Sequence, residues 1–149
     1  MTRGAEFLKL IAEYISKTKK FDRNLKMLNY LSLENGQAKV KFTVTEDHIN
    51  TEGHLHPGLT TTLIDVLSSH ALLVHGDGFS GVSTNIHVSL SQRASVGDLI
   101  LIEAKVSKLL EPLAFVEVEL LRKNGMVEEV VARGQHTLFV RPGVHYSRS

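Results

Sequence analysis

The chain has 149 residues, and its 17 basic and 16 acidic side chains leave a formal net charge of +1 at pH 7. Charges this evenly balanced exclude the strong field expected of a protein that binds nucleic acid or an anionic membrane surface. The absence of cysteine excludes disulfide bonds, cysteine nucleophiles and cysteine-ligated zinc. The length predicts a single domain over residues 1–149, whose core would gain from oligomerisation.

No targeting or membrane-spanning segment is evident in the chain. Apolar runs such as Ala71-Leu72-Leu73-Val74 are far too short to cross a bilayer. The N-terminus lacks the apolar segment and cleavage site of a secretory signal. We therefore expect a cytoplasmic protein without a membrane span. The mildly basic, amphipathic N-terminus keeps a mitochondrial location open as an alternative.

The first expected elements are an outer helix and a β-hairpin. Apolar residues at helical spacing predict a surface helix over about residues 5–18. Two strand-like segments within residues 25–45 flank Asn35-Gly36, a dipeptide that suits the positive φ angles of a tight turn. Apolar and polar residues alternate in the second segment, which predicts one buried and one solvated face.

A turn-rich polar loop over residues 48–58 leads into a central helix over about residues 58–74. Asp65 is the only charged side chain in that helix. An ionised carboxylate in an apolar, buried helix is costly unless a specific group compensates it. This isolation makes Asp65 a candidate functional residue, and the alternative is a structural hydrogen bond to a neighbour such as Thr61.

Strand-like alternation returns after the central helix. Four segments predict long strands in a meander, at about residues 82–91, 98–109, 113–121 and 126–140. A second hairpin turn is expected at Asn124-Gly125, and the tail over about residues 141–149 is expected to be loose. The G-x-G-x-x-G pattern from Gly76 to Gly81 follows a helix and precedes a strand, so we interpret it as a loop. This order predicts the α+β class, with an antiparallel sheet of about six strands wrapped around the central helix and an N-terminal helix.

Spaced motifs along the chain carry a family resemblance. In order they are His48-Ile49-Asn50-Thr51-Glu52-Gly53-His54-Leu55-His56, Gly58-Leu59, Asp65, Gly81-Val82-Ser83 and Ala132-Arg133-Gly134-Gln135-His136-Thr137. They resemble the hotdog-fold acyl-CoA thioesterases, of the thioesterase superfamily member 2 type, over about residues 21–139. The resemblance implies hydrolysis of fatty or related acyl-CoA to the free acid and coenzyme A, without a cofactor. It also implies a homodimer with its sheets paired side by side, often within a homotetramer, and an active site across the dimer interface.

The resemblance also implies a role for each residue of the site. Asp65 would act as nucleophile or as general base on water, and a poorly hydrated carboxylate is a stronger base. Ser83 would help to hold that water. Both side chains would face the partner subunit's Asn50, which orients the thioester or water, and the partner subunit's His56, which binds the substrate carbonyl. We predict no metal site, because the histidines within residues 48–56 lack the spacing of a ligand set.

Basic and buried polar residues outside this set have other expected roles. Arg93, Arg133 and Lys108 are candidates for the phosphates of coenzyme A, since charge-assisted hydrogen bonds suit them. As single basic residues they are also typical of a solvated surface. His70 lies on the apolar central helix, and we interpret it as a satisfied core or interface histidine.

Pro57 departs from the family pattern. The family commonly has His-Gly-Gly where this chain has His56-Pro57-Gly58, and the N–H of the first glycine is the family's main oxyanion donor. Proline suits the first helical turn but has no N–H, so the amides of Gly58 and Leu59 are the expected substitutes. Losing such a donor costs on the order of 100- to 1000-fold in turnover. Two alternatives therefore stay open, namely a non-catalytic or weakly active acyl-CoA-binding protein and a hotdog hydratase or dehydratase.

Overall fold

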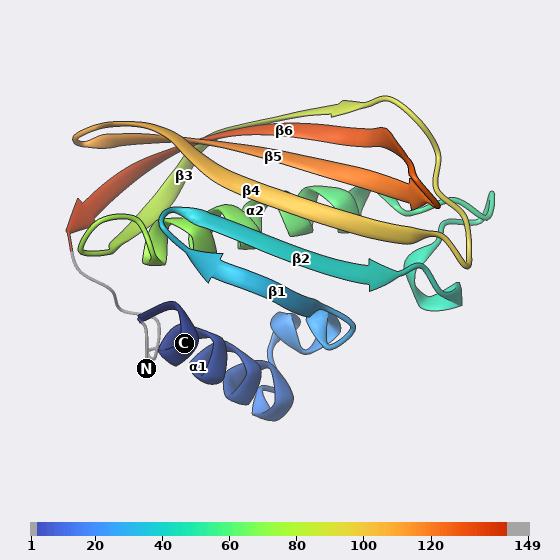
Figure 1. The fold of residues 1–149 in the computed structure, drawn as a ribbon, viewed down its shortest axis with the longest axis horizontal. Helices are drawn as coiled ribbons and strands as arrows, with labels where there is room; N and C mark the ends of the chain where they lie inside the picture. The colour runs from blue at the N-terminus through green and yellow to red at the C-terminus, as the bar shows by residue number, and fades with distance from the viewer. Residues whose placement is uncertain (1–2, 143–149) are drawn as a thin grey trace.

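A computed structural model describes residues 3–142 of the chain. Its helices, with η for 3-10 helices, and its strands are α1 (Arg3–Lys17), η1 (Phe21–Leu25), β1 (Asn29–Glu34), β2 (Gln37–Thr43), η2 (Glu46–His48), α2 (Pro57–Leu73), β3 (Phe79–Leu90), β4 (Leu99–Leu110), β5 (Leu113–Asn124) and β6 (Val127–Pro142). The strands form one antiparallel sheet in the order β1-β2-β4-β5-β6-β3. Figure 1 shows the sheet curving over α2, with α1 outside it below β1. The predicted α+β fold, a six-stranded sheet wrapped around a central helix with an N-terminal helix, is confirmed.

The two hairpin turns show what turn residues predict. Asn35 and Gly36 have φ angles of 51° and 72°, so the first predicted turn is confirmed as one with two positive-φ positions. The second turn lies one residue later than predicted, because Asn124 pairs with Val127 and belongs to β5. Only its first loop residue, Gly125, has a positive φ, at 64°. Glycine at the first loop position suits the other common two-residue turn, which needs one such residue.

The position of β3 corrects the predicted meander. Strands β4, β5 and β6 follow one another as expected, but β3 pairs with β6 at the far edge of the sheet and not with β4. The connection from β3 to β4 therefore passes two strands, β6 and β5. Alternation along a strand shows which face is buried, but it contains no information about which strand lies alongside.

The core lies between α2 and the concave face of the sheet. Leu63, Ile64 and Leu67 of α2 are fully buried there. A Cβ atom at Gly134 of β6 would lie only 2.6 Å from Ile64 Cγ2, so glycine at this position allows α2 to approach β6 closely. This close packing brings the middle of α2 next to the side chains of β6 and β3.

His70 is the core histidine that the sequence predicted. It is only 3% exposed, and its Nδ1 lies 2.7 Å from the hydroxyl of Tyr30. Burial lowers the pKa of His70 to about 4, so the ring is neutral at pH 7. Its partner and its burial confirm a satisfied core residue.

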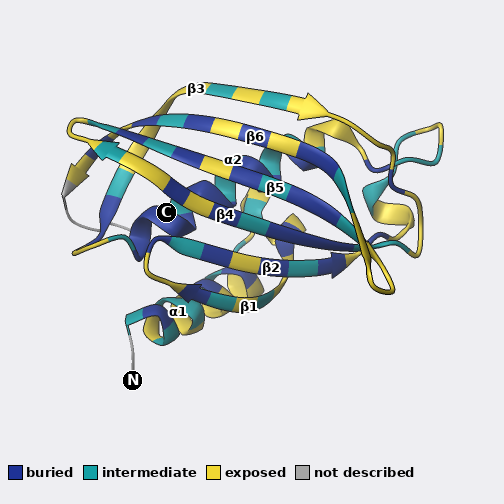
Figure 2. Ribbon diagram, turned by 45° about the horizontal axis from the view of Figure 1, so that its top comes forward, coloured by how far each residue is buried: buried dark blue, intermediate teal, exposed yellow. Residues whose placement is uncertain are grey.

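One edge of the sheet and one stripe of α2 remain uncovered. Strand β3 contains no charged residue, and its Val82 and Leu90 are 71% and 57% exposed. Figure 2 shows β3 along the free edge, with most of its length exposed. On α2, Thr61, Asp65 and Ser69 follow one another at helical spacing and are only partly buried. Edge strands without charges are prone to pair with another strand, so this side of the molecule is suited to a partner.

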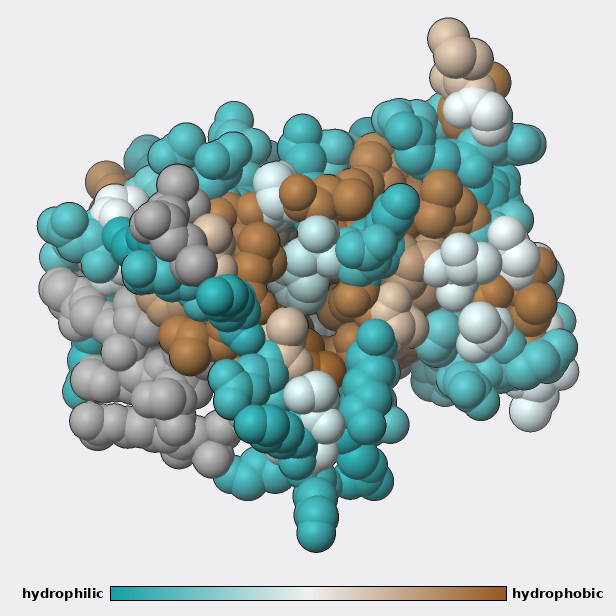
Figure 3. Space-filling view, turned by 60° about the horizontal axis from the view of Figure 1, so that its bottom comes forward, coloured by the Kyte–Doolittle hydropathy of each residue, from teal (hydrophilic) through white to brown (hydrophobic). Residues whose placement is uncertain are grey.

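Hydrophobic surface is also accessible on the underside of the molecule. Figure 3, with the underside of Figure 1 brought forward, shows hydrophobic side chains around a hollow, with hydrophilic side chains toward the rim. No helix among residues 3–142 has the length and apolar character needed to span a bilayer. Of the tail predicted to be loose, Arg141 and Pro142 belong to β6, and residues 143–149 lie outside the described residues.

Candidate active site

Three polar side chains from separate elements meet beside the middle of α2. The pairing of β3 with β6 brings the Ser83 hydroxyl oxygen to 2.7 Å from His136 Nε2. The Asp65 Oδ1 atom, from α2, lies 4.0 Å from the same nitrogen. We call these three residues the carboxylate cluster. Asp65 and Ser83 were predicted site residues, and the structure brings them together through His136.

His136 lies in the motif of residues 132–137, but no role was predicted for it. It is only 1% exposed and lies on β6 between the buried residues Gly134 and Leu138. A polar residue at such an inward-facing position needs a hydrogen-bond partner, so the alternation along this strand could have indicated a role for His136. Burial lowers the pKa of His136, and the nearby carboxylate of Asp65 opposes this shift. His136 is therefore neutral at pH 7 and does not form a charged pair with Asp65.

The hydrogen bonds of the carboxylate cluster indicate the tautomer of His136 and the direction of the Ser83 hydroxyl hydrogen. His136 Nδ1 is buried without a partner among the described residues. An unpaired N–H is rarer than an unpaired acceptor, so the hydrogen belongs on Nε2, which donates to the Ser83 oxygen. The hydroxyl hydrogen of Ser83 is then available to a second acceptor, such as a water molecule next to Asp65.

The carboxylate of Asp65 is more exposed than the sequence predicted. Its side chain is 50% exposed, although α2 was expected to be surrounded by apolar groups. The structural alternative also differs from what is observed, because the Thr61 hydroxyl donates to the carbonyl of Pro57 and not to Asp65. The apolar character of a helix predicts that it is buried, but not whether a second subunit must complete the burial. In the single chain, Asp65 lies on the uncovered stripe of α2.

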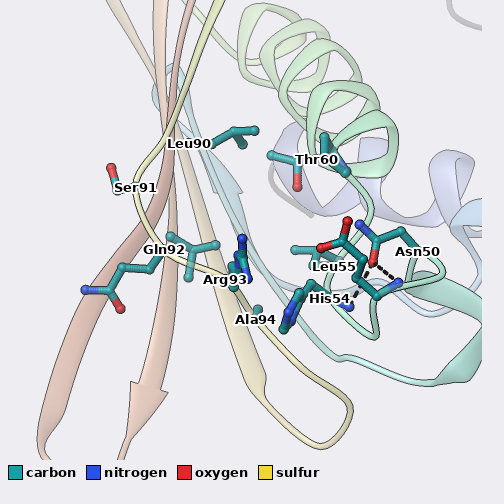
Figure 4. A pocket seen from close by; sticks show the side chains of 12 residues that line it. Asn50, His54, Leu55, Thr60, Leu90, Ser91, Gln92, Arg93 and Ala94 are labelled. Atoms are coloured by element: carbon teal, nitrogen blue, oxygen red, sulfur yellow. Dashed lines mark hydrogen bonds between the residues drawn. The ribbon is translucent and has the colours of Figure 1, made fainter.

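Asn50 uses its two side-chain atoms differently. Its Oδ1 accepts hydrogen bonds from the amides of Glu52 and His54, at 3.1 Å and 3.0 Å. Figure 4 shows these two bonds closing the loop beside Arg93 and Thr60. Its Nδ2 has no hydrogen-bond partner within residues 3–142. The oxygen therefore holds the loop, while the NH₂ group is available to a ligand.

The start of α2 has fewer free amides than a usual helix. Pro57 has no N–H, and the Gly58 amide donates to His56 Nδ1 at 2.9 Å, so His56 caps the helix. Of the two predicted substitute donors, only the Leu59 amide lacks a partner in the described part of the chain. Because His56 Nδ1 accepts a hydrogen bond, the neutral ring has its hydrogen on Nε2. We call Asn50, His56 and Leu59 the donor loop.

The carboxylate cluster and the donor loop are separate in the single chain. Asn50 lines a cavity of about 310 Å³, and His56 and Leu59 line another of about 590 Å³. Asp65 lines neither of these cavities. Neither of these two cavities therefore contains all of the predicted residues.

The candidate phosphate-binding residues lie in three different places. Arg93 lines the cavity beside Asn50 (Figure 4). Lys108 lines a different cavity of about 490 Å³. Arg133 Nε lies 3.0 Å from a carboxylate oxygen of Glu119 on the surface. Arg93 therefore shares its cavity with Asn50, and Lys108 shares its cavity with His136 of the carboxylate cluster.

Comparisons with known proteins agree on the class of this protein. The sequence model of the thioesterase superfamily matches residues 52–129. Human acyl-coenzyme A thioesterase 13 is 34% identical over 137 residues, which cover 92% of this chain and 96% of the human protein. The crystal structure of zebrafish thioesterase superfamily member 2 superposes with a TM-score of 0.84 at 32% identity, covering 93% of this chain and 99% of that one. Mouse thioesterase superfamily member 2 has a TM-score of 0.80 at 29% identity, covering 93% and 97%.

The fold is thus the hotdog fold that the sequence motifs predicted, with its sheet around a central helix. The chain belongs to the thioesterase superfamily. The family resemblance is confirmed over nearly the whole described chain.

Proposed function

We propose that this protein hydrolyses fatty or related acyl-CoA thioesters to the free acid and coenzyme A, with Asp65 as general base or nucleophile. One observation carries the proposal. The Asp65 carboxylate accepts no hydrogen bond from residues 3–142, yet it lies beside the neutral His136–Ser83 pair. An unengaged carboxylate next to a hydroxyl is a suitable arrangement for binding and deprotonating a water molecule. The similarity to human acyl-coenzyme A thioesterase 13 supports acyl-CoA as the substrate.

In the reaction we propose, Ser83 holds a water molecule and Asp65 removes its proton. The water oxygen bonds to the thioester carbonyl carbon, and the carbonyl oxygen takes on negative charge. When the carbon–sulfur bond breaks, the electron pair moves to sulfur and the proton follows, which gives the thiol and the acid. Neutral His136 stabilises this arrangement by donating to Ser83 without protonating Asp65.

We propose that the complete site forms between two subunits of a homodimer. The charged oxygen needs donors, and the Asn50 NH₂ group, the His56 Nε2–H and the Leu59 amide of the donor loop are suitable. These donors lie apart from Asp65 in one chain. The uncharged free edge of β3 and the partly buried stripe of α2 support a partner at this side. A homotetramer remains an expectation from the resemblance.

A second candidate function is a weakly active or non-catalytic acyl-CoA-binding protein. It is favoured by the start of α2, where Pro57 has no N–H and the Gly58 amide is already bonded to His56. Only one backbone donor, at Leu59, is left. Saturable acyl-CoA binding without release of thiol distinguishes this function from hydrolysis.

The substitution Asp65→Asn tests the leading proposal. An amide of the same shape keeps the packing but cannot take a proton, so turnover is expected to fall by roughly 100- to 10,000-fold. Release of free thiol from acyl-CoA measures turnover, and light scattering confirms that the oligomer is unchanged. A folded Asp65→Asn protein with full activity rules out this role for Asp65.

A further inference from the structure

A cavity of about 590 Å³ lies between η1, η2 and the first turn of α2, and the proposed chemistry leaves most of it unexplained. Arg23 and Lys26 line one wall, and His48 and His56 line another. Asp47 is the only carboxylate in the lining. The polar lining is therefore dominated by groups that donate hydrogen bonds.

Neighbouring backbone amides fix the tautomer of both histidines in this cavity, so that each ring has a hydrogen to donate. The Thr45 amide donates to His48 Nδ1 at 3.0 Å, and the Gly58 amide donates to His56 Nδ1 at 2.9 Å. A neutral imidazole that accepts at Nδ1 has its hydrogen on Nε2. Burial lowers the pKa of His48, which is consistent with a neutral ring. Neither Nε2–H has a partner among residues 3–142, so both rings offer a free donor.

The charge on the η1 side of the cavity is positive, although the whole chain is almost neutral. Residues 19–26 contain four basic side chains, Lys19, Lys20, Arg23 and Lys26, and one acidic side chain, Asp22. Within the described residues, neither Arg23 nor Lys26 forms an ion pair, and Arg23 donates to the carbonyl of Lys19. The positive end of the α2 dipole lies at the same cavity.

Apolar side chains complete the lining. Met27, Ile49 and Leu59 lie among the polar groups. A ligand for this cavity therefore combines an apolar or neutral part with an anionic group. Because His56 and Leu59 of the donor loop also line this cavity, an anion bound in it can belong to the same substrate molecule as the thioester.

We propose that this cavity binds an anionic group of the substrate, a phosphate or a carboxylate, at some distance from the thioester carbonyl. The inference rests on the proposed thioesterase function and adds a subsite to it. Arg23 and Lys26 supply charge, and the Nε2–H group of His48 supplies a directed hydrogen bond, while the Nε2–H of His56 is left for the thioester oxygen. The two sources of the anion are the phosphates of coenzyme A and a carboxylate at the far end of the acyl group.

The double substitution Arg23→Gln with Lys26→Gln tests the subsite. Three substrates with one acyl chain length are compared: the acyl-CoA, the same acyl group on pantetheine, which has no phosphate, and the ω-carboxyacyl-CoA. The control is Lys19→Gln with Lys20→Gln, which removes the same charge from the same segment but outside the cavity. Both proteins are compared with wild type as full-length oligomers of matched thermal stability.

The ratio of kcat/KM values between substrates shows which anion binds in the cavity. If the phosphates bind here, the preference for acyl-CoA over acyl-pantetheine falls roughly tenfold in the Arg23/Lys26 variant and not in the control. If the acyl carboxylate binds here, the preference for ω-carboxyacyl-CoA over acyl-CoA falls instead. Either loss is expected to shrink at high salt. Unchanged ratios, or an equal loss in the control, overturn the proposal.

A binding measurement separates this inference from the proposed function. The ring nitrogens of a ¹⁵N-labelled protein report directly on His48 and His56, with the exposed His87 of β3 as an internal control. Addition of coenzyme A or of adipate is expected to shift the Nε2 signal of His48 and to leave His87 unchanged. A protein that shows this shift but hydrolyses no thioester disproves the proposed function and keeps the subsite. If neither ligand moves the His48 signal, the subsite does not exist.

Discussion

The carboxylate cluster and the donor loop are assembled in different ways. Asp65, Ser83 and His136 come from α2, β3 and β6, and their contacts depend on the pairing of strands about 50 residues apart in sequence. The donor loop is held by bonds between residues two to four positions apart, such as those of Asn50 Oδ1 and His56 Nδ1. In the carboxylate cluster, packing between distant elements leaves the Asp65 carboxylate without a hydrogen-bond partner among residues 3–142. In the donor loop, by contrast, a local hydrogen bond to His56 already occupies the Gly58 amide.

This difference shows where each region is sensitive to substitution. In the donor loop, one atom of a side chain can hold the loop while another is proposed to bind the substrate, as in Asn50. A useful substitution there removes one of these atoms and keeps the other. In the carboxylate cluster, each side chain touches another, so substitutions there are expected to be coupled.

Outside the carboxylate cluster, the largest effect is expected from Asn50→Asp in the donor loop. A carboxylate keeps acceptors for the amides of Glu52 and His54 but has no NH₂ group to donate to the thioester oxygen. Turnover is expected to fall roughly 100-fold while thermal stability stays close to wild type. Asn50→Ala, which also removes the acceptor, is the comparison and is expected to be less stable. If Asn50→Asp turns over at the wild-type rate, Asn50 has only the structural role.

A mixing experiment tests whether the two regions meet across a dimer. Asp65→Asn and Asn50→Asp proteins are each nearly inactive, but a mixed dimer contains one site with neither substitution. Random exchange makes half of the dimers mixed, so activity is expected to recover to roughly a quarter of wild type. Thiol release is measured after the two proteins are unfolded and refolded together. A mixture no more active than its components shows that each site lies within one chain.

Restoring an amide at the start of α2 is expected to raise activity. Pro57→Gly adds the N–H that proline lacks, and turnover is expected to increase roughly tenfold if the thioester oxygen is short of donors. Glycine also loosens the first turn, so the protein is expected to lose about 0.5–1 kcal/mol of stability. Steady-state kinetics and thermal unfolding measure the two changes. An unchanged turnover indicates that His56 and Leu59 already provide enough donors.

The smallest effect is expected from His136→Gln. The glutamine NH₂ group can replace Nε2–H as the donor to Ser83, so turnover is expected to fall by no more than roughly fivefold. His136→Ala removes this donor and leaves a cavity at a site that is 1% exposed, so it is expected to cost about 2–5 kcal/mol of stability. Denaturant unfolding and thiol release separate the two variants. Equal turnover in both variants shows that the hydrogen bond to Ser83 does not contribute.

Much of the fold could be predicted from local sequence patterns. Helical spacing predicted α1 and α2 to within a few residues, and Asn35-Gly36 predicted the first hairpin because few residues accept two positive φ angles. The isolation of Asp65 on an apolar helix identified the central residue of the candidate site. These features depend on residues that are close in sequence, so each can be recognised without knowing the rest of the structure.

Tertiary structure decided the features that depend on distant residues. The place of β3 beside β6, the burial of His136 and its contact with Ser83 all follow from strand pairing that alternation does not specify. The bond from the Gly58 amide to His56 depends on a ring orientation that spacing does not reveal. Sequence therefore identified the residues of the candidate site, and folding determined which of their atoms lack a hydrogen-bond partner among residues 3–142, because hydrogen-bond partners depend on three-dimensional distance.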